Sequence, residues 1–197
     1  MDDQRKRAQR ALEDRYEVRL AGEGGQGMIL AGVILAEAAV QAGLNAVQTQ
    51  SYGPEARGGA SRSEVVIARG EIDYPKVMSA DFLLCMSQEA CDKFYTRVKD
   101  DGCIVVDATN VSRVPTMRAI TAPITQIAEE VTGRRITASM VALGLLGGLS
   151  EVVSREALEK AVAERVPAGY EDLNLKALAA GFAEAGRLRG EMGDLGE

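Results

Sequence analysis

Hydrophobic and polar positions along the chain alternate in periods that predict strands separated by helices. Residues 16–21 alternate apolar and polar side chains as a short strand does, and residues 28–42 carry apolar and small side chains at helical spacing. Gly43 then provides a helix stop, and residues 45–49 are expected to form a second strand. Because a helix connects the two strands, we expect them to run parallel.

The middle of the chain continues this alternation. Two strands are expected over residues 64–69 and 72–74, on either side of a turn at residues 69–71. Unbroken apolar runs at residues 82–86 and 103–107 predict strands that are buried on both faces. Such buried strands are typical of a parallel sheet covered by helices.

Helices are expected after these central strands. Ser87 can cap a helix over residues 88–99, because a serine hydroxyl can accept a hydrogen bond from a backbone N–H of the first turn. A short strand at residues 119–122 precedes a mainly helical region. Within that region, helices are expected at residues 137–149, 154–166 and 173–189.

Together these elements predict an α/β fold. We expect a single domain with an open, mostly parallel sheet, helices on both faces, a Rossmann-like outline and additional C-terminal helices. A chain of 197 residues is long enough to bury one core and short for two. Residues 1–15 are expected to form an N-terminal helical extension, residues 16–189 the domain and residues 190–197 a flexible tail.

Composition and charge narrow the possible functions. Aromatic residues make up 4% of the chain and Trp is absent, which argues against a stacking surface for single-stranded nucleic acid. The net charge of −6 argues against a general binder of phosphate backbones. No apolar stretch is long enough to cross a bilayer and the N-terminus lacks a signal-like apolar region, so we expect a cytoplasmic protein without membrane contact.

Cysteine and histidine usage limits the chemistry of the chain itself. The three cysteines are odd in number and form no C-x-x-C pair, which disfavours a disulfide framework, a zinc site or a cluster-binding sequence. Histidine is absent, so the commonest general base and the commonest metal ligand are both missing. We therefore expect no metal site and no cofactor bound by this chain alone.

A glycine-rich motif follows the first strand and precedes the first helix. Its letters G-E-G-G-Q-G match G-x-G-x-x-G, in the order Gly22, Glu23, Gly24, Gly25, Gln26 and Gly27. Glycines permit tight turns and close backbone approach, while free N–H groups at the helix start favour an anionic group. We therefore assign Gly22, Gly24, Gly25, Gln26 and Gly27 as candidate cofactor-binding residues.

Three interpretations of this motif stay open. A dinucleotide site also needs an Asp or Glu at the end of the second strand, but that strand ends in Gln48, Thr49, Gln50 and Ser51. The glycines could instead serve only tight packing of helix on sheet. The interpretation we favour is a loop that touches a cofactor or substrate supplied largely by another chain.

A second motif leaves the end of the second strand, at the sheet edge that also bears the glycine loop. It spans residues 51–61 and places Arg57 beside glycines, which suits the binding of a carboxylate or phosphate. The alternative is an arginine that only ties the loop to Glu55 or Glu64. Arg57 is the candidate for anion binding, and the further binding candidates in this loop are Ser51, Tyr52, Gly58 and Gly59.

The two motifs in this order resemble the gamma subunit of the 2-oxoacid:ferredoxin oxidoreductases. The second motif, Q-S-Y-G-P-E-A-R-G-G, is most similar to the 2-oxoglutarate branch, 2-oxoglutarate synthase. The similarity covers roughly residues 18–186 and includes residues 81–88, 102–110, 139–149 and Asn174. One position departs, because the family often has Asn where Ser139 precedes the M-x-x-L-G stretch.

The resemblance implies the fold of domain III of pyruvate:ferredoxin oxidoreductase and a role in oxidative decarboxylation of a 2-oxoacid to an acyl-CoA. It implies thiamine diphosphate, Mg²⁺ and iron–sulfur clusters in partner subunits, with coenzyme A as a substrate. The implied partners are alpha, beta and ferredoxin-like delta subunits, with ferredoxin as electron acceptor. The chain would complete the substrate or coenzyme A side of the site and be inactive alone.

The helix at residues 137–149 is rich in small residues, which suits either close contact with the alpha subunit or tight packing inside this chain. Two other functions are weighed against the oxidoreductase subunit. The first is a stand-alone Rossmann-like nucleotide-binding protein, and the second is a non-catalytic scaffold subunit.

Overall fold

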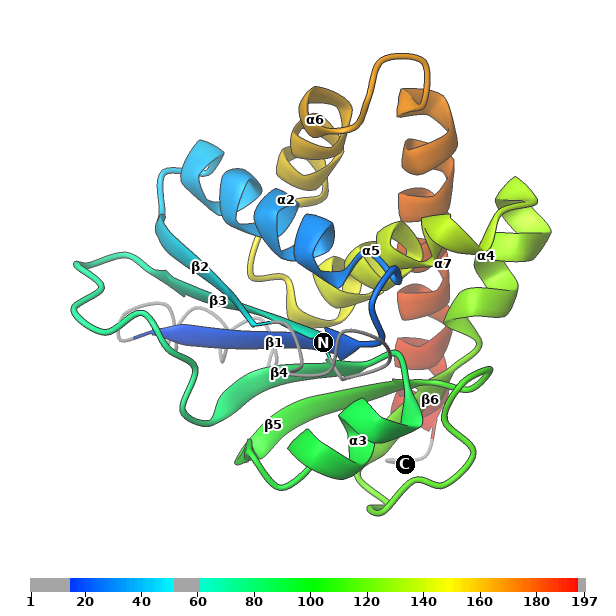
Figure 1. Ribbon diagram of the computed structural model, residues 1–197, viewed down its shortest axis with the longest axis horizontal. Coiled ribbons are helices and arrows are strands. Elements are labelled where there is room, and N and C mark those ends of the chain that lie inside the picture. The colour runs from blue at the N-terminus through cyan, green and yellow to red at the C-terminus, as the bar shows by residue number, and fades with distance from the viewer. Residues whose placement is uncertain (1–14, 52–60, 195–197) are drawn as a thin grey trace.

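The described residues form a mixed six-stranded sheet with helices packed on it. The computed structural model of the chain describes residues 15–51 and 61–194. The strand order is β2-β3-β1-β4-β5-β6 (Figure 1). The strands are β1 (Tyr16–Gly22), β2 (Asn45–Ser51), β3 (Ser61–Ala68), β4 (Ala80–Cys85), β5 (Val98–Asp107) and β6 (Ala119–Ala122).

The direction of the strands is mostly parallel, as the sequence predicts. Strands β1, β4, β5 and β6 pair in parallel, whereas β3 pairs antiparallel with both β1 and β2. Strand β2 therefore runs in the same direction as β1. The two are not neighbours, however, because β3 lies between them along its whole length.

The helices cover the two faces of the sheet unequally. They are α2 (Met28–Gln41), α3 (Gln88–Phe94), α4 (Ile124–Thr132), the 3₁₀ turn η1 (Arg135–Thr137), α5 (Ala138–Ser150), α6 (Arg155–Arg165) and α7 (Glu171–Asp194). Helix α3 lies on one face, while α2 and the C-terminal helices lie on the other (Figure 1). The prediction of helices on both faces is thus confirmed.

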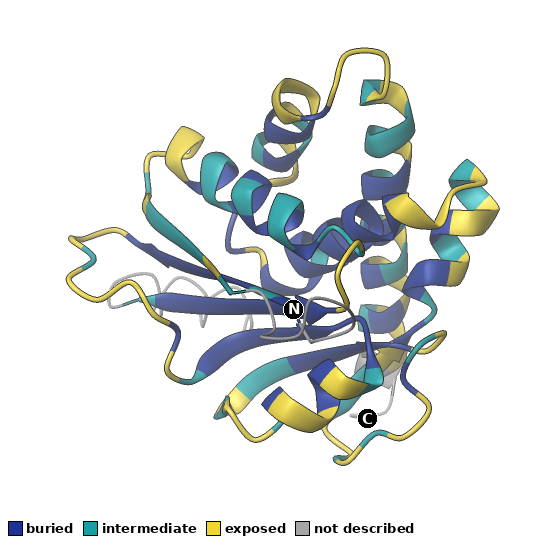
Figure 2. Ribbon diagram, viewed as in Figure 1, coloured by how far each residue is buried: buried dark blue, intermediate teal, exposed yellow. Residues whose placement is uncertain are grey.

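Alternation of side chains along the central strands creates two hydrophobic cores. Val18 and Leu20 of β1 belong to the larger core, beneath α2 and α5. Ala21 of the same strand belongs to the smaller core, beneath α3. This division follows from the two-residue period of a strand, which sends successive side chains to opposite faces. Figure 2 shows the resulting buried centre, in which α5 is enclosed by the sheet and by other helices.

Helix α5 packs closely against α7 through glycines. A Cβ atom added at Gly144 would collide with the Leu178 carbonyl, and one added at Gly181 would collide with the Val141 carbonyl. The two backbones therefore approach each other directly at these positions. The small residues of α5 serve packing inside this chain, one of the two uses that the sequence left open.

Several predicted boundaries are wrong. Residues 72–74 form no strand. The loop continues to β4, and side chains of β1 hold its later part: Arg19 donates to the Val77 carbonyl at 2.7 Å, and Glu17 accepts from Met78 N–H at 2.7 Å. Helix α3 ends at Phe94 instead of residue 99, since the chain turns at Arg97 to enter β5.

The C-terminal helix is longer than expected. Helix α7 continues to Asp194, so residues 190–194, expected in a flexible tail, are helical. The predicted N-terminal helical extension lies almost wholly outside the described residues. Among the described helices, none combines the length and the apolarity needed to cross a membrane.

Candidate functional site

The glycine loop connects β1 to α2 and depends on left-handed backbone at two positions. Gly25 has φ 90° and Gly27, the N-cap of α2, has φ 76°. Residues with a Cβ rarely adopt these angles, so glycine is required there. No side chain caps α2 and its first turn holds no acidic residue. The N–H groups at this helix start therefore keep their capacity to bind an anion.

Gln26 closes the loop with its own side chain. Its Oε1 accepts a hydrogen bond from Glu23 N–H at 2.7 Å, and its Nε2 donates to the Met86 carbonyl at 3.0 Å. A Cβ at Gly22 would collide with this same amide, which explains the glycine there. The primary role of Gln26 is thus to fix the loop against the end of β4.

The start of α5 packs against the end of the glycine loop, where Ser139 lies next to Gly27. A Cβ at Gly27 would lie 2.7 Å from Ser139 Oγ, so α2 and α5 meet closely at this point. Ser139 Oγ also donates to the Ile136 carbonyl at 3.4 Å. Ser139, the position that departs from the family pattern, therefore bonds to the preceding turn and leaves room for Gly27.

A cavity of about 210 Å³ opens beside the glycine loop, at the carboxyl ends of β1, β4 and β5. Its lining residues are Gly25, Gln26, Met86, Asn110, Thr125, Arg135, Ile136 and Ala138. The carboxyl edge of such a sheet is where α/β proteins bind ligands. Of the predicted site residues, the structure brings Gly25 and Gln26 into this cavity.

The structure adds three polar residues that sequence reasoning did not select, namely Asn110, Thr125 and Arg135. Arg135 forms an ion pair with Glu129 at 3.2 Å through Nε, and its side chain is 62% exposed. A guanidinium so exposed can also bind a ligand anion. A weak signal for Asn110 existed in the sequence, because it follows a buried strand that ends at Asp107.

The second loop is anchored next to the glycine loop. Ser51 ends β2, and Ser61 begins β3 opposite Gly22 in the β1–β3 register. Ser61 Oγ donates to the Gly22 carbonyl at 3.2 Å. The candidate residues between these anchors, which are Tyr52, Arg57, Gly58 and Gly59, lie outside the described residues.

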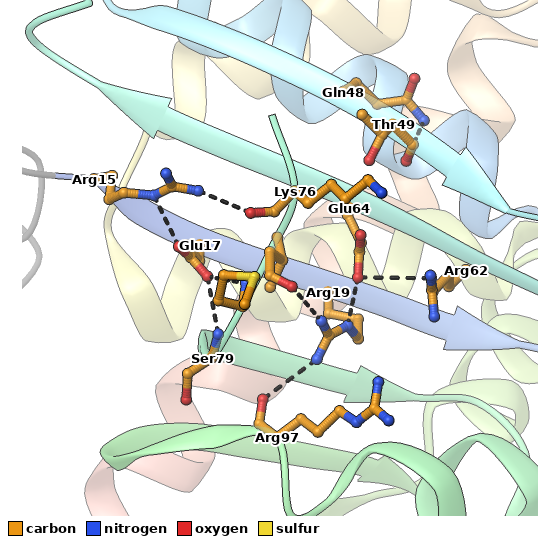
Figure 3. A network of polar contacts seen from close by, with 12 residues as sticks. Arg15, Glu17, Arg19, Gln48, Thr49, Arg62, Glu64, Lys76, Ser79 and Arg97 are labelled. Atoms are coloured by element: carbon orange, nitrogen blue, oxygen red, sulfur yellow. Dashed lines mark hydrogen bonds and ion pairs between the residues drawn. The ribbon is translucent and has the colours of Figure 1, made fainter. Parts of the chain in front are cut away.

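A buried ion-pair network lies on the α3 face of the sheet, near the start of β3 (Figure 3). Arg19 Nε contacts Glu64 Oε1 at 2.8 Å, and Arg62 Nε lies 3.6 Å from the same oxygen. Arg19 also donates to the carbonyls of Val77 and Arg97. A buried charge without partners is costly, and these contacts compensate the charges of Arg19 on β1 and of Glu64 on β3.

This network bears on the alternative role for Arg57. Glu64, one of the two carboxylates considered as a partner for Arg57, is already compensated by the guanidinium groups of Arg19 and Arg62. The electrostatic gain from a third arginine at Glu64 is correspondingly small.

Two of the three cysteines lie together in the smaller core. Cys85, at the end of β4, and Cys91, in α3, are both buried in the smaller core. Their mutual hydrogen bond, together with burial, raises the pKa of Cys85 well above its usual value, and the same bond lowers the pKa of Cys91. In the described part of the chain, no three His, Cys, Asp or Glu side chains gather where they could hold a metal ion.

A larger cavity of about 600 Å³ lies at the far end of α5, lined in part by Gly148, Glu151, Arg155, Phe182 and Arg189. Both arginines in this group form ion pairs within the chain, Arg189 with Glu151 and Arg155 with Glu159, each at 2.7 Å. Among residues 15–51 and 61–194, none that belongs to either sequence motif lines it. We place the candidate site at the smaller cavity, because the glycine loop and its free N–H groups are there.

Comparison with known proteins identifies the family. The family model described as "Pyruvate ferredoxin/flavodoxin oxidoreductase" matches residues 17–184. The chain belongs to this family. It is 49% identical over 186 residues to "2-oxoglutarate synthase subunit KorC" of Methanocaldococcus jannaschii, a match that covers 91% of this chain and 98% of that protein.

Solved structures agree with this assignment. The gamma subunit of a keto/oxoacid ferredoxin oxidoreductase from Geobacter sulfurreducens PCA has a TM-score of 0.80 and 48% identity, covering 88% of this chain and 97% of the other. A 2-oxoglutarate:ferredoxin oxidoreductase from Magnetococcus marinus, with 2-oxoglutarate, coenzyme A and succinyl-CoA bound, has a TM-score of 0.79 and 25% identity. That match covers 88% of this chain and 31% of the other. The α/β fold and the resemblance to oxidoreductase gamma subunits are confirmed.

Proposed function

We propose that this chain is the gamma subunit of a 2-oxoglutarate:ferredoxin oxidoreductase. The observation that carries the proposal is the 49% identity, over nearly the full length of both chains, to a 2-oxoglutarate synthase subunit. In the proposed reaction, 2-oxoglutarate loses the carboxyl group next to its keto carbon as CO₂. The remaining acyl group is transferred to the sulfur of coenzyme A. Ferredoxin accepts the electrons and succinyl-CoA is the product.

The redox groups of this reaction are assigned to partner subunits. The Mg²⁺ ion that accompanies thiamine diphosphate is held by oxygen ligands such as carboxylates, and iron–sulfur clusters are held by Cys thiolates. The chain has no histidine, and Cys85 and Cys91 are buried in the smaller core. The proposed partners are alpha, beta and ferredoxin-like delta subunits of a cytoplasmic complex, which passes electrons to ferredoxin.

The part proposed for this chain is to complete the side of the active site that binds substrate or coenzyme A. The glycine loop offers N–H groups from Gly25 and from the start of α2, and Arg135 adds a cation at the same cavity. These are donors suited to carboxylate and phosphate groups. Arg57 is proposed as a further anion-binding residue, on a loop whose anchors Ser51 and Ser61 lie at this edge.

A stand-alone dinucleotide-binding protein is less well supported. In such proteins, an acidic residue at the end of the strand beside β1 binds the ribose hydroxyls. Here β3 occupies that position and runs antiparallel, while β2 lies one strand further away and ends in Gln50 and Ser51. The ribose-binding arrangement is therefore not formed by the described residues.

The proposed function is tested by copurification and a substrate panel. The tagged chain should copurify with the products of neighbouring genes as a complex that reduces ferredoxin or methyl viologen. With coenzyme A present, 2-oxoglutarate should give a higher kcat/KM than pyruvate, 2-oxoisovalerate or indolepyruvate. A complex that prefers another 2-oxoacid would refute the substrate assignment, and a chain that purifies alone with a bound dinucleotide would refute the subunit assignment.

A further inference from the structure

One buried carboxylate at the carboxyl edge of the sheet has no part in the function proposed above. Asp107 ends β5 and is fully buried. It lies next to the cavity by the glycine loop, because Asn110 and Thr125, two of the residues bonded to it, both line that cavity. A buried charge persists only where hydrogen bonds compensate it, so its partners indicate what it holds in place.

Asp107 accepts four hydrogen bonds. Its Oδ1 accepts from Thr109 N–H at 3.3 Å and from Thr125 N–H at 3.1 Å. Its Oδ2 accepts from Thr125 Oγ1 at 2.5 Å and from Asn110 Nδ2 at 2.6 Å. A carboxylate can only accept, so the amide of Asn110 must turn its NH₂ group toward Asp107. Asp107 thereby determines which way this amide faces.

The NH₂ group of Asn110 has a second contact with the same pair of residues. Nδ2 also donates to Thr125 Oγ1 at 3.1 Å, so the NH₂ group is held against the Asp107–Thr125 pair. The other polar atom of the side chain is its carbonyl oxygen, Oδ1. Within residues 15–51 and 61–194, no hydrogen bond is recorded to this oxygen, and Asn110 lines the cavity. The fixed amide thus has an acceptor atom, Oδ1, without a partner among these residues.

We infer that Asn110 is a specificity-determining residue whose amide oxygen accepts a hydrogen bond from an N–H or O–H group of the ligand. Asp107 is the positioning residue that keeps the amide in this orientation. The inference rests on the proposed function for the identity of the ligand. It deepens that function, because an acceptor distinguishes between the molecules that take part in the reaction.

The chemistry of the reactants selects a class of ligand. Ionised 2-oxoglutarate carries only acceptors, since its two carboxylates and its keto group have no hydrogen to donate. Coenzyme A carries amide N–H and hydroxyl groups beside its phosphates, and thiamine diphosphate carries an amino group beside its diphosphate. The cavity combines one acceptor, on Asn110, with anion-binding donors from the glycine loop and Arg135. It therefore fits a phosphorylated ligand that also donates a hydrogen bond.

The test uses the assembled complex with three variants of this chain. Asn110→Ala removes the acceptor. Asp107→Asn places an NH₂ group opposite the Asn110 amide, which must then turn over and present its own NH₂ group to the cavity. The double variant Asp107→Asn with Asn110→Asp restores a donor–acceptor pair across the same contact, with the donor now at position 107, and leaves a carboxylate oxygen for the ligand. Asn45→Ala, which removes an exposed amide at the other end of β2, is the control.

We expect Asn110→Ala and Asp107→Asn each to raise the KM for coenzyme A, or the Kd for thiamine diphosphate, about tenfold, the effect of one lost hydrogen bond. The KM for 2-oxoglutarate and the kcat at saturation should stay within about twofold of wild type, since the lost bond is ligand-specific. The double variant should regain part of the affinity, because it restores the contact but moves the carboxylate to the cavity proposed to bind a phosphorylated ligand. The control should not differ from wild type. The ligand whose affinity falls in these variants is the one that binds in this cavity.

The inference is overturned if neither ligand is affected, or if the KM for 2-oxoglutarate rises as much as that for coenzyme A. Thermal unfolding of each complex shows whether Asp107→Asn still folds, and Asn110→Ala decides alone if it does not. If the wild-type complex prefers another 2-oxoacid, the proposed substrate fails and the same comparison is made with that acid. If it turns over no 2-oxoacid, calorimetric titration with coenzyme A and with thiamine diphosphate gives the affinities.

Discussion

Two glycine-rich regions of this chain use the missing side chain in opposite ways. In the loop at residues 22–27, Gly25 has left-handed backbone and open space around the position of a Cβ. In the α5–α7 pair, Gly144 and Gly181 have ordinary helical backbone and no space at all, because the partner helix fills it. In the first region, the N–H groups at the start of α2 have no side-chain cap. In the second region, the glycines are in direct contact with the backbone of the partner helix.

The difference shows what a glycine in a sequence can mean. At Gly25 the constraint is the dihedral angle, so any residue with a Cβ is strained there whatever its surroundings. At Gly181 the constraint is distance, so the cost of a side chain depends on the neighbouring backbone. Substitutions that separate these two kinds of constraint test this account.

The largest effect is expected for Gly181→Ala. The added Cβ would collide with the Val141 carbonyl, and a backbone group cannot move aside as a flexible side chain can. We expect the free energy of unfolding to fall by about 3 kcal/mol, as for severe overpacking. Chemical denaturation of the purified chain measures it.

The matched control for this change lies on the same helix. At Gly186, a Cβ would meet nothing within 4 Å, so Gly186→Ala should leave stability unchanged or raise it by up to about 1 kcal/mol through helix propensity. Equal effects of the two substitutions would show that α5 and α7 do not touch at Gly181.

The second effect concerns Arg57, in the loop whose anchor Ser61 lies opposite Gly22. In the assembled complex, Arg57→Ala should lower kcat/KM by the equivalent of about 2 to 3 kcal/mol, typical of losing a charged hydrogen bond. Arg57→Lys should lie between it and wild type, because lysine keeps the charge and loses the bidentate geometry. Steady-state kinetics and thermal unfolding are measured together.

Here stability decides between the two roles of Arg57. If Arg57→Ala turns over normally, or fails only because the subunit no longer folds or assembles, the arginine is structural. Arg69→Ala, at the opposite end of β3, is the control for a general loss of positive charge.

The smallest effect is expected within the glycine loop. Gly25→Ala should cost about 1 kcal/mol of stability, because a Cβ disfavours left-handed backbone. Gly24→Ala should cost less, because Gly24 does not have a positive φ and nothing lies within 4 Å of its Cβ position. Denaturation curves of the two variants compare them directly. A cost at Gly24 equal to that at Gly25 would contradict the role assigned to the dihedral angle.

Local patterns predicted most of the fold. The apolar run of β4 and the capping residue Ser87 are where the sequence indicates, and Ser87 accepts a hydrogen bond from the first turn of its helix. What local patterns could not predict is the position of β3, since pairing between distant strands depends on register and burial across the whole sheet.

The candidate site was predictable where it depends on a contiguous motif. The glycine loop follows from its letters and its place between a strand and a helix. Asn110 was missed, because its importance comes from contacts with Asp107 and with Thr125, the latter on a separate helix. Such a cluster exists only once the ends of β5 and β6 lie side by side.

The central claim is that this chain is one subunit of a larger oxidoreductase. It is tested most directly by assaying methyl viologen reduction with 2-oxoglutarate, coenzyme A and thiamine diphosphate, using this chain alone, the partner subunits alone, and both together. The account predicts that the chain alone is folded and inactive, and that full activity needs both. Viologen reduction by the chain alone, or undiminished activity of the partner subunits without it, would contradict the account.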